Sequence, residues 1–163
     1  MRKVFSLLLI CLVLLSGCMA GSAQEEPAPV GQLQIANPWN SYDNLADAVS
    51  ACGLTYPVPA NIPAGYSAES YRVMNGSLLE VTYINGDTEI TVRMQAGENL
   101  DISGVYANFT KTETFDQRGA SVIKMLAENC CVYLVHRNSY SFSIYATSLA
   151  ADEAACEILS YIS

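Results

Sequence analysis

The sequence has few of the groups that carry out catalysis. It contains one histidine, His136, among 163 residues. No spacing supports a Ser/His/Asp triad, and neither a Gly-x-Ser-x-Gly elbow nor a phosphate-binding glycine loop after a strand occurs. Cys130, Cys131 and His136 lack the second ligand pair that a zinc site needs. We therefore expect no catalytic residues, no metal and no cofactor, and a protein that is not an enzyme.

Basic residues are also scarce. Eight Lys+Arg stand against 16 Asp+Glu, which gives a formal net charge of −8 at pH 7. An acidic surface is repelled by nucleic acid and by anionic membrane surfaces. We therefore expect no nucleic-acid partner and no electrostatic attachment to a membrane.

A long hydrophobic run is missing as well. The longest apolar stretch, Val4 to Leu15, has about a dozen residues, whereas a membrane-spanning helix needs about 20. Arg2 and Lys3 precede this stretch, and a basic start followed by a short apolar segment is the layout of a secretory signal peptide. The segment is therefore interpreted as a cleaved signal and not as a stable anchor.

The signal ends in Leu15-Ser16-Gly17-Cys18, which resembles the lipobox of bacterial prolipoproteins. The resemblance implies a diacylglyceryl thioether on Cys18 and cleavage after residues 1–17. Acyl chains would then hold the protein at the extracytoplasmic face of the cell membrane. The alternative is an ordinary secretory signal that is cleaved near Ala20 or Ala23 and discards Cys18.

Two further regions follow the signal. Residues 18–34 are small, polar and proline-containing, so we expect a lipidated cysteine followed by a flexible tether. Residues 35–163 are long enough for a single domain with its own core. Without Arg2 and Lys3, six basic residues remain against 16 acidic ones, a net charge of −10.

The predicted domain contains four cysteines. In an exported protein they are candidates for two disulfides. A bond between adjacent residues is the least favoured, because neighbours on a strand point to opposite faces. The alternative is buried free thiols, which behave as small apolar side chains. The candidate residues are Cys52, Cys130, Cys131 and Cys156.

Helical spacing of apolar residues predicts one helix near each end of the domain. The first covers 40–53, with Ser41 or Asp43 as N-cap and Gly53 as the stop. The second begins after Ser148. The first apolar stripe is Leu45, Ala48, Val49 and Cys52, and the second is Ala151, Ala155, Ile158 and Ile162.

Between the helices the apolar pattern has a period of two, which predicts strands. Asn75-Gly76 and Asn85-Gly86 predict hairpin turns, and residues 96–110 break the pattern as a long loop. We predict an α+β fold, in which an antiparallel meander of about six to seven strands packs both helices on one face. The predicted strands are 66–74, 77–84, 88–95, 111–117, 120–127, 131–136 and 139–146.

Glutamates and tyrosines are the polar candidates on these strands. Glu80, Glu89 and Glu113 face outward in the predicted pattern, so we expect them to be solvated. The chain has ten tyrosines against four phenylalanines. Tyrosine packs well in strands and also suits binding faces, so both roles stay open. The candidate binding face is Tyr71, Tyr83, Tyr133, Tyr140 and Tyr145.

Several short motifs resemble an uncharacterised exported domain of Gram-positive bacteria. That domain occurs in lipoproteins and in the outer segments of anti-sigma-factor-like membrane proteins. The resemblance covers about residues 36–163 and implies an envelope role, without catalytic residues to transfer. The motifs are Asn37-Pro38-Trp39, Val58-Pro59, Ile62-Pro63-Ala64-Gly65-Tyr66, Val81-x-Tyr83-x-Asn85-Gly86 and Asp101-Ile102-Ser103-Gly104.

These observations together predict a lipid-anchored extracytoplasmic domain that binds an envelope protein or a ligand without catalysis. The alternative is a carrier or sensor, which would hold an apolar small molecule or a lipid in the concavity of the sheet. A carrier requires a sizeable apolar pocket, whereas an interaction module requires an exposed apolar patch.

Overall fold

The computed structural model of the protein describes residues 37–55, 58, 61–98 and 101–162. Residues Ala36–Ser163 group into one compact unit. The predicted signal peptide at 1–17, the predicted lipidation site Cys18 and the predicted tether to residue 34 lie outside the described residues.

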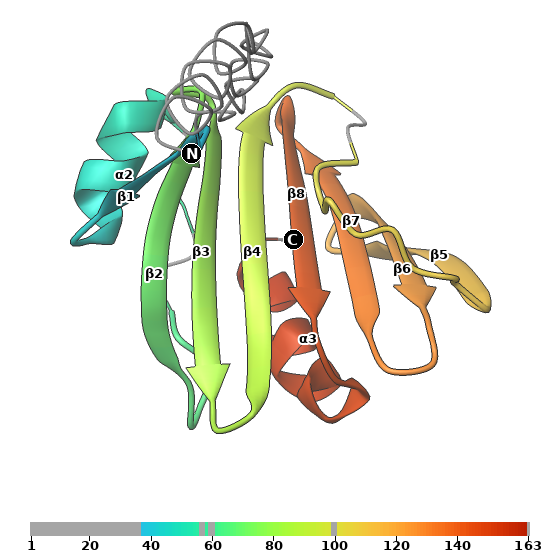
Figure 1. The fold of residues 1–163 in the computed structure, drawn as a ribbon. Helices are drawn as coiled ribbons and strands as arrows, with labels where there is room; N and C mark the ends of the chain where they lie inside the picture. The colour runs from blue at the N-terminus through green and yellow to red at the C-terminus, as the bar shows by residue number, and fades with distance from the viewer. Residues whose placement is uncertain (1–36, 56–57, 59–60, 99–100, 163) are drawn as a thin grey trace, which may run out of the picture. The chain divides into compact units, whose positions relative to one another are not determined.

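The described residues form one eight-stranded antiparallel sheet with two α-helices and one 3-10 helix (Figure 1). The α+β class is therefore confirmed. The helices are α2 (Leu45–Cys52), η1 (Leu149–Ala151) and α3 (Asp152–Ile162). The strands are β1 (Trp39–Tyr42), β2 (Ser67–Met74), β3 (Leu78–Asn85), β4 (Thr88–Ala96), β5 (Lys111–Gln117), β6 (Ala120–Leu126), β7 (Cys131–Arg137) and β8 (Tyr140–Ala146).

The strand order is β1-β2-β3-β4-β8-β7-β6-β5, so two four-stranded meanders lie side by side and meet where β4 pairs with β8. The prediction of a single meander with about six to seven strands is therefore wrong in strand number and in connection. Short turns do join antiparallel neighbours. The segment 97–110 instead carries the chain from the end of β4 across the sheet to its far edge, where β5 begins (Figure 1).

The missed strand, β1, lies where the sequence predicts the start of the first helix. Residues Trp39–Tyr42 pair with β2, with Trp39 opposite Met74. The helix therefore begins at Leu45, and Asn44 is its N-cap instead of Ser41 or Asp43: its side chain accepts a 2.9 Å hydrogen bond from the Asp47 amide. Gly53 ends the helix at φ 62°, as predicted. Pairing with β2 overrides the local helical pattern.

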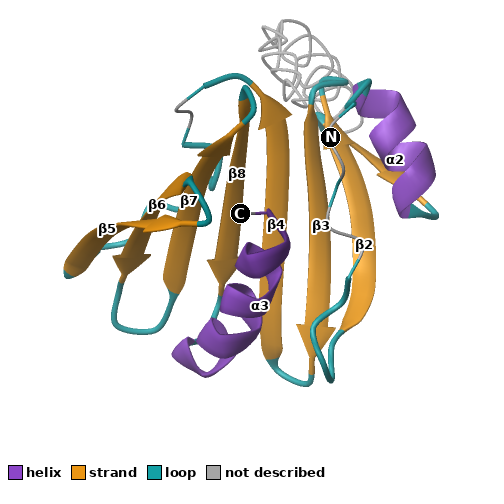
Figure 2. Cartoon of the chain, turned by 180° about the vertical axis from the view of Figure 1, so that it is seen from behind, coloured by secondary structure: helices purple, strands orange, loops and turns teal. Residues whose placement is uncertain are grey.

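Both helices lie over the same side of the sheet (Figure 2), which we call the covered face. Leu79, Val81 and Tyr83 of β3 point into this core, because alternate strand residues share a face. The predicted stripe of the last helix is confirmed, since its four residues are each at most 1% exposed. Ser148 caps the preceding turn by accepting from the Ala150 amide.

The opposite side of the sheet, which we call the outer face, carries no described helix. Successive residues of a strand point to opposite faces of the sheet, so Leu78, Glu80 and Thr82 of β3 lie on the outer face. The segment 101–110 passes in front of this face in Figure 1. Ile102 and Ser103 of that segment are buried. The predicted loop is therefore an ordered layer on the outer face at these positions.

Candidate functional site: the outer face of the sheet

One half of the outer face holds a buried ion network, which we call the arginine clamp (Trp39, Arg72, Glu80 and Arg93). Glu80 lies between Arg72 and Arg93 in the strand register. Arg72 Nε donates to Glu80 Oε1, and Arg93 Nε donates to Oε2, each at 2.8 Å. The Trp39 ring centre lies 5.0 and 5.6 Å from the two guanidinium carbons, within the range of cation–π attraction.

The clamp corrects the expectation that Glu80 is solvated, because this side chain is only 1% exposed. A buried carboxylate needs charged or hydrogen-bonding partners, and the two arginines supply them. The alternation of strand residues predicts that Glu80 faces away from the core. It does not predict that a loop covers that outer side.

Arg93 also fixes the loop above the sheet. Its Nη1 donates to the carbonyl oxygens of Ile102 at 3.1 Å and Ser103 at 2.6 Å. The Asp101 carboxylate accepts from both the amide and the hydroxyl of Ser103. Gly104 has a left-handed φ of 63°, and a Cβ at this position would overlap the Arg93 guanidinium. Gly104 is therefore required by both backbone conformation and space.

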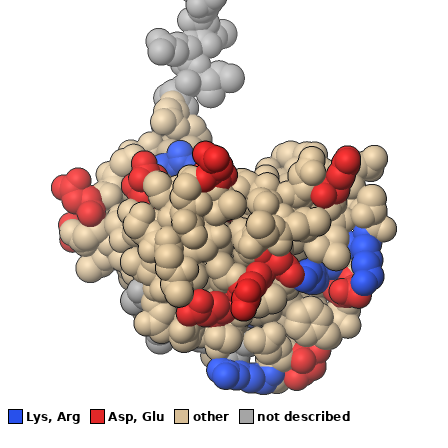
Figure 3. Space-filling model, turned by 90° about the horizontal axis from the view of Figure 1, so that it is seen from below, with Lys and Arg blue, Asp and Glu red and all other residues tan. Residues whose placement is uncertain are grey.

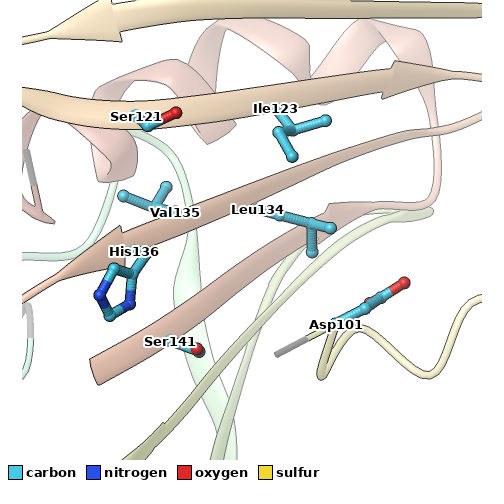
Figure 4. A pocket seen from close by; sticks show the side chains of 7 residues that line it. All are labelled: Asp101, Ser121, Ile123, Leu134, Val135, His136 and Ser141. Carbon is cyan, nitrogen blue, oxygen red and sulfur yellow. The ribbon is translucent and has the colours of Figure 1, made fainter. Parts of the chain in front are cut away.

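The other half of the outer face contains a cavity, which we call the outer pocket. Its volume is about 140 Å³. Side chains from β6, β7 and β8 form its floor, and Asp101 reaches it from the loop (Figure 4). Ser121, His136 and Ser141 lie side by side in one row of the register. The lining residues are Asp101, Ser121, Ile123, Leu134, Val135, His136 and Ser141.

The polar groups of the pocket are not arranged as a catalytic triad. Ser141 donates its hydroxyl proton to the carbonyl oxygen of Gly97 at 2.9 Å, and Asp101 is engaged with Ser103. The buried His136 Nδ1 has no hydrogen-bond partner. A general base needs a donor in reach and a group that orients it. The Nδ1 atom is also shielded from solvent, so the pocket is lined mainly by apolar side chains and by the hydroxyl groups of Ser121 and Ser141.

The five candidate tyrosines do not share one surface. Tyr83 and Tyr133 are 3% and 1% exposed and belong to the core. Tyr71 and Tyr140 are partly buried against the same core, whereas Tyr145 lies on the outer face opposite Thr91. Four of the five tyrosines therefore belong to the core or pack against it, and Tyr145 does not.

Other apolar residues are exposed. Ile123, which lines the outer pocket, is 37% exposed, and Tyr106 in the segment 101–110 is fully exposed. Sequence reasoning missed both. The alternation along β6 places Ile123 outward, but it does not show that Ile123 meets a cavity.

A second group of ionisable side chains, which we call the thiol cluster, lies on the covered face between β6, β7 and α3. Asp152 at the start of α3 is its centre. Asp152 Oδ2 accepts from Lys124 Nζ at 2.8 Å, and Oδ1 accepts from Cys131 Sγ at 3.2 Å and from Tyr133 Oη at 2.7 Å. Tyr133 Oη also lies 3.0 Å from Cys156 Sγ.

The pKa shifts in this cluster follow from burial and shared hydrogen bonds. Burial, reinforced by the bond to Asp152, raises the pKa of Cys131 to about 12. Burial also raises the pKa of Tyr133, with added effects of Cys156 and Asp152. Burial alone would raise the pKa of Asp152, but the bonds from Lys124, Tyr133 and Cys131 outweigh it and lower that pKa. The cluster therefore stabilises a carboxylate and a neutral thiol.

The four cysteines of the domain are free thiols in this structure. Cys131 and Cys156 belong to the thiol cluster, whereas Cys52 ends α2. Cys131 and His136 are five residues apart on β7 and so lie on opposite faces of the sheet. In the part of the chain that the structure describes, no three His, Cys, Asp or Glu side chains are grouped to hold a metal ion.

Comparisons with known proteins add no relative. No protein-family model, curated protein or solved structure matches the chain. Within residues 37–55, 58, 61–98 and 101–162, no helix has the length and apolar character needed to cross a membrane.

Proposed function

We propose that the protein is a lipid-anchored extracytoplasmic binding module and that the outer pocket receives one apolar or aromatic side chain of an envelope protein. The observation that carries this proposal is the outer pocket itself. Apolar side chains make up much of its lining, and Ile123 among them is 37% exposed. Interfaces concentrate their binding energy where one anchor side chain fills such a pocket.

The size of the cavity favours a side chain over a lipid. Pockets for drug-sized ligands have volumes of roughly 300–1,000 Å³, and the outer pocket has about 140 Å³. An engineered apolar cavity of about 150 Å³ binds benzene. One ring or one branched aliphatic group therefore matches the volume, and a free small molecule of that size is the alternative occupant.

The charge distribution narrows the class of partner. Acidic side chains are scattered over the surface seen from below, and no broad basic patch is visible on that face (Figure 3). The whole chain carries a net charge of −8. Nucleic acid is therefore an unfavourable partner, and a neutral or basic protein surface is a favourable one.

Membrane attachment rests on the lipobox-like Leu15-Ser16-Gly17-Cys18, which resembles that of bacterial prolipoproteins. Two or more acyl chains make anchoring durable, which positions the binding domain close to the outer surface of the membrane. Growth with a labelled fatty acid tests this step. Cys18→Ala is expected to lose the label and to release the protein from membranes, and Cys11→Ala is the matched control.

Binding at the outer pocket is tested by nuclear magnetic resonance. Addition of phenol or isobutanol to the full chain is expected to shift the amide signals of residues that line the pocket. Leu134→Trp fills the cavity and is expected to abolish these shifts. Phe115→Trp, on the edge strand and absent from the pocket lining, is the control that retains them. Uniform shifts over the surface, or shifts unchanged by Leu134→Trp, would contradict the proposed site.

A further inference from the structure

The thiol cluster joins two cysteines that are distant in sequence. Cys131 on β7 is fully buried, and Cys156 on α3 is exposed. Both sulfurs contact the same hydroxyl–carboxylate pair, because Tyr133 Oη binds Asp152 Oδ1 and touches Cys156, while Asp152 Oδ1 accepts from Cys131. Side chains of β7 and α3 thus already meet around the two thiols.

We infer that Cys131 and Cys156 are a thiol–disulfide exchange site that takes an external disulfide, either of a small thiol compound or of a protein dithiol, as its oxidant. The site is independent of the outer pocket, because it lies on the covered face of the sheet. Its oxidised form links α3 to β7 through one intramolecular disulfide.

The different exposure of the two thiols sets the order of the steps. Exposed Cys156 loses its proton to water, and its thiolate attacks the external disulfide. A mixed disulfide forms, and one external thiolate leaves. Cys131 then attacks the Cys156 sulfur and releases the second external thiolate. Two protein S–H bonds and one external S–S bond break, while one protein S–S bond and two external S–H bonds form.

The surroundings of Cys131 fit the second step and not the first. Burial raises the pKa of Cys131 to about 12, so it remains a thiol until a sulfur is brought next to it. Asp152 holds the Cys131 thiol by a 3.2 Å hydrogen bond. The departing external thiolate takes the thiol proton as the bond closes. The Tyr133 hydroxyl must then withdraw from between the two sulfurs.

The other two cysteines are poorly placed to compete. Thr55, just after α2, bonds Tyr140 Oη at the start of β8, while Cys131 pairs with Ala146 at the end of β8. A seven-residue strand spans about 20 Å, whereas a disulfide needs Cα atoms about 4.4–6.8 Å apart. Cys52 therefore lies toward the other end of the sheet. Cys130 adjoins Cys131, and side chains of strand neighbours diverge.

The test uses the reduced full chain, incubated with oxidised glutathione and then alkylated and digested with trypsin. Mass spectrometry is expected to find residues 125–137 linked to residues 138–163. Cys130→Ser should retain this link, and both Cys131→Ser and Cys156→Ser should lose it. If Cys131→Ser fails to fold, retention of the link in Cys130→Ser still identifies Cys131, because residues 125–137 hold only these two cysteines. Tyr133→Phe removes the intervening hydroxyl and is expected to speed formation of the link.

Three outcomes would overturn the inference. One is a link from residues 125–137 to the peptide that contains Cys52 in place of residues 138–163. Another is a link that requires Cys130 instead of Cys131. The third is Cys156 recovered only as a glutathione adduct or as an alkylated thiol in folded protein, since Cys131 would then not reach it.

Discussion

The two halves of the outer face have similar backbone structures, but they differ in whether their buried polar groups have hydrogen-bond partners. Each half consists of antiparallel strands, and residues of the segment 101–104 contact both. In the arginine clamp, both oxygens of buried Glu80 have charged partners. In the outer pocket, buried His136 Nδ1 has none. In the first half the buried carboxylate has its hydrogen-bond partners. In the second half a buried nitrogen without a hydrogen-bond partner belongs to a residue that lines an apolar cavity.

This difference assigns separate roles to the two halves: the arginine clamp holds the loop in place, and the loop helps to form the outer pocket. A satisfied buried network makes a region rigid, and an unsatisfied polar group costs free energy unless something binds it. The clamp therefore acts as the support, and the pocket is the region left for a partner. Four changes, taken from the largest expected effect to the smallest, test this division.

Removal of Glu80 should have the largest effect. Glu80→Ala leaves Arg72 and Arg93 without their shared carboxylate. Because these two side chains are 40% and 20% exposed, solvent offsets part of the loss. We expect a loss of about 3 kcal/mol of unfolding free energy, the lower end for a broken buried pair. Urea denaturation measures the loss. Glu113→Ala is the control, because Glu113 makes an exposed pair with Lys111, and exposed pairs contribute at most about 1 kcal/mol. Equal losses in both variants would contradict the assignment of Glu80 as the support.

Gly104→Ala should have the next largest effect. The added Cβ meets a left-handed backbone and the Arg93 guanidinium, and strain of this kind costs about 2 kcal/mol. Hydrogen exchange should show faster exchange in the loop segment while the strand amides stay protected. Gly119→Ala, at φ 80° with open space around its Cβ position, controls for backbone strain alone.

His136→Leu should change stability in the opposite direction. It replaces an unsatisfied buried nitrogen with an apolar group, which is expected to raise the unfolding free energy by about 1 kcal/mol. Thermal denaturation measures the gain, and loss of phenol binding should accompany it. A destabilised variant would show that His136 has a structural partner and would contradict the account of Nδ1 as an unsatisfied buried atom.

The smallest effect concerns pH and the covered face. Asp152 has a pKa below its usual value of 3.8, so its contribution is complete above about pH 4 and is lost as the pH falls through the lower, folded-state pKa. Denaturation between pH 5 and pH 2.5 should show a shallower loss of stability in Asp152→Asn than in the unchanged chain. Identical slopes would mean that Asp152 is not stabilised as a carboxylate.

Much of the fold follows from the sequence. The alternation of apolar residues predicts seven of the eight strands, and the predicted ends of each strand lie within about one residue of those in the structure. The predicted buried residues of the last helix are also correct. These elements depend on local patterns. β1 was missed because Trp39–Tyr42 is a strand only through its pairing with β2. The pairing of β4 with β8 likewise depends on where a long loop leads.

The candidate site was less predictable. Its main features arise from residues that are distant in sequence: Arg93 binds carbonyl oxygens of the loop, and Asp101 of the loop lines the same pocket as Leu134 on β7. The motif Asp101-Ile102-Ser103-Gly104 marks the loop in the sequence. No sequence motif indicates that Arg93 is its partner. Tyrosine content pointed to a binding face, although most of those side chains fill the core.

The most direct test of the proposed binding function is photo-crosslinking in cells that produce the full chain. A photoreactive amino acid is placed at Ile123 on the rim of the outer pocket or at Phe115. These positions are 37% and 38% exposed, on neighbouring strands but opposite faces. We expect a discrete protein adduct from position 123 that Leu134→Trp removes, and none from position 115. Equal adducts from both positions, or none from position 123, would contradict the account.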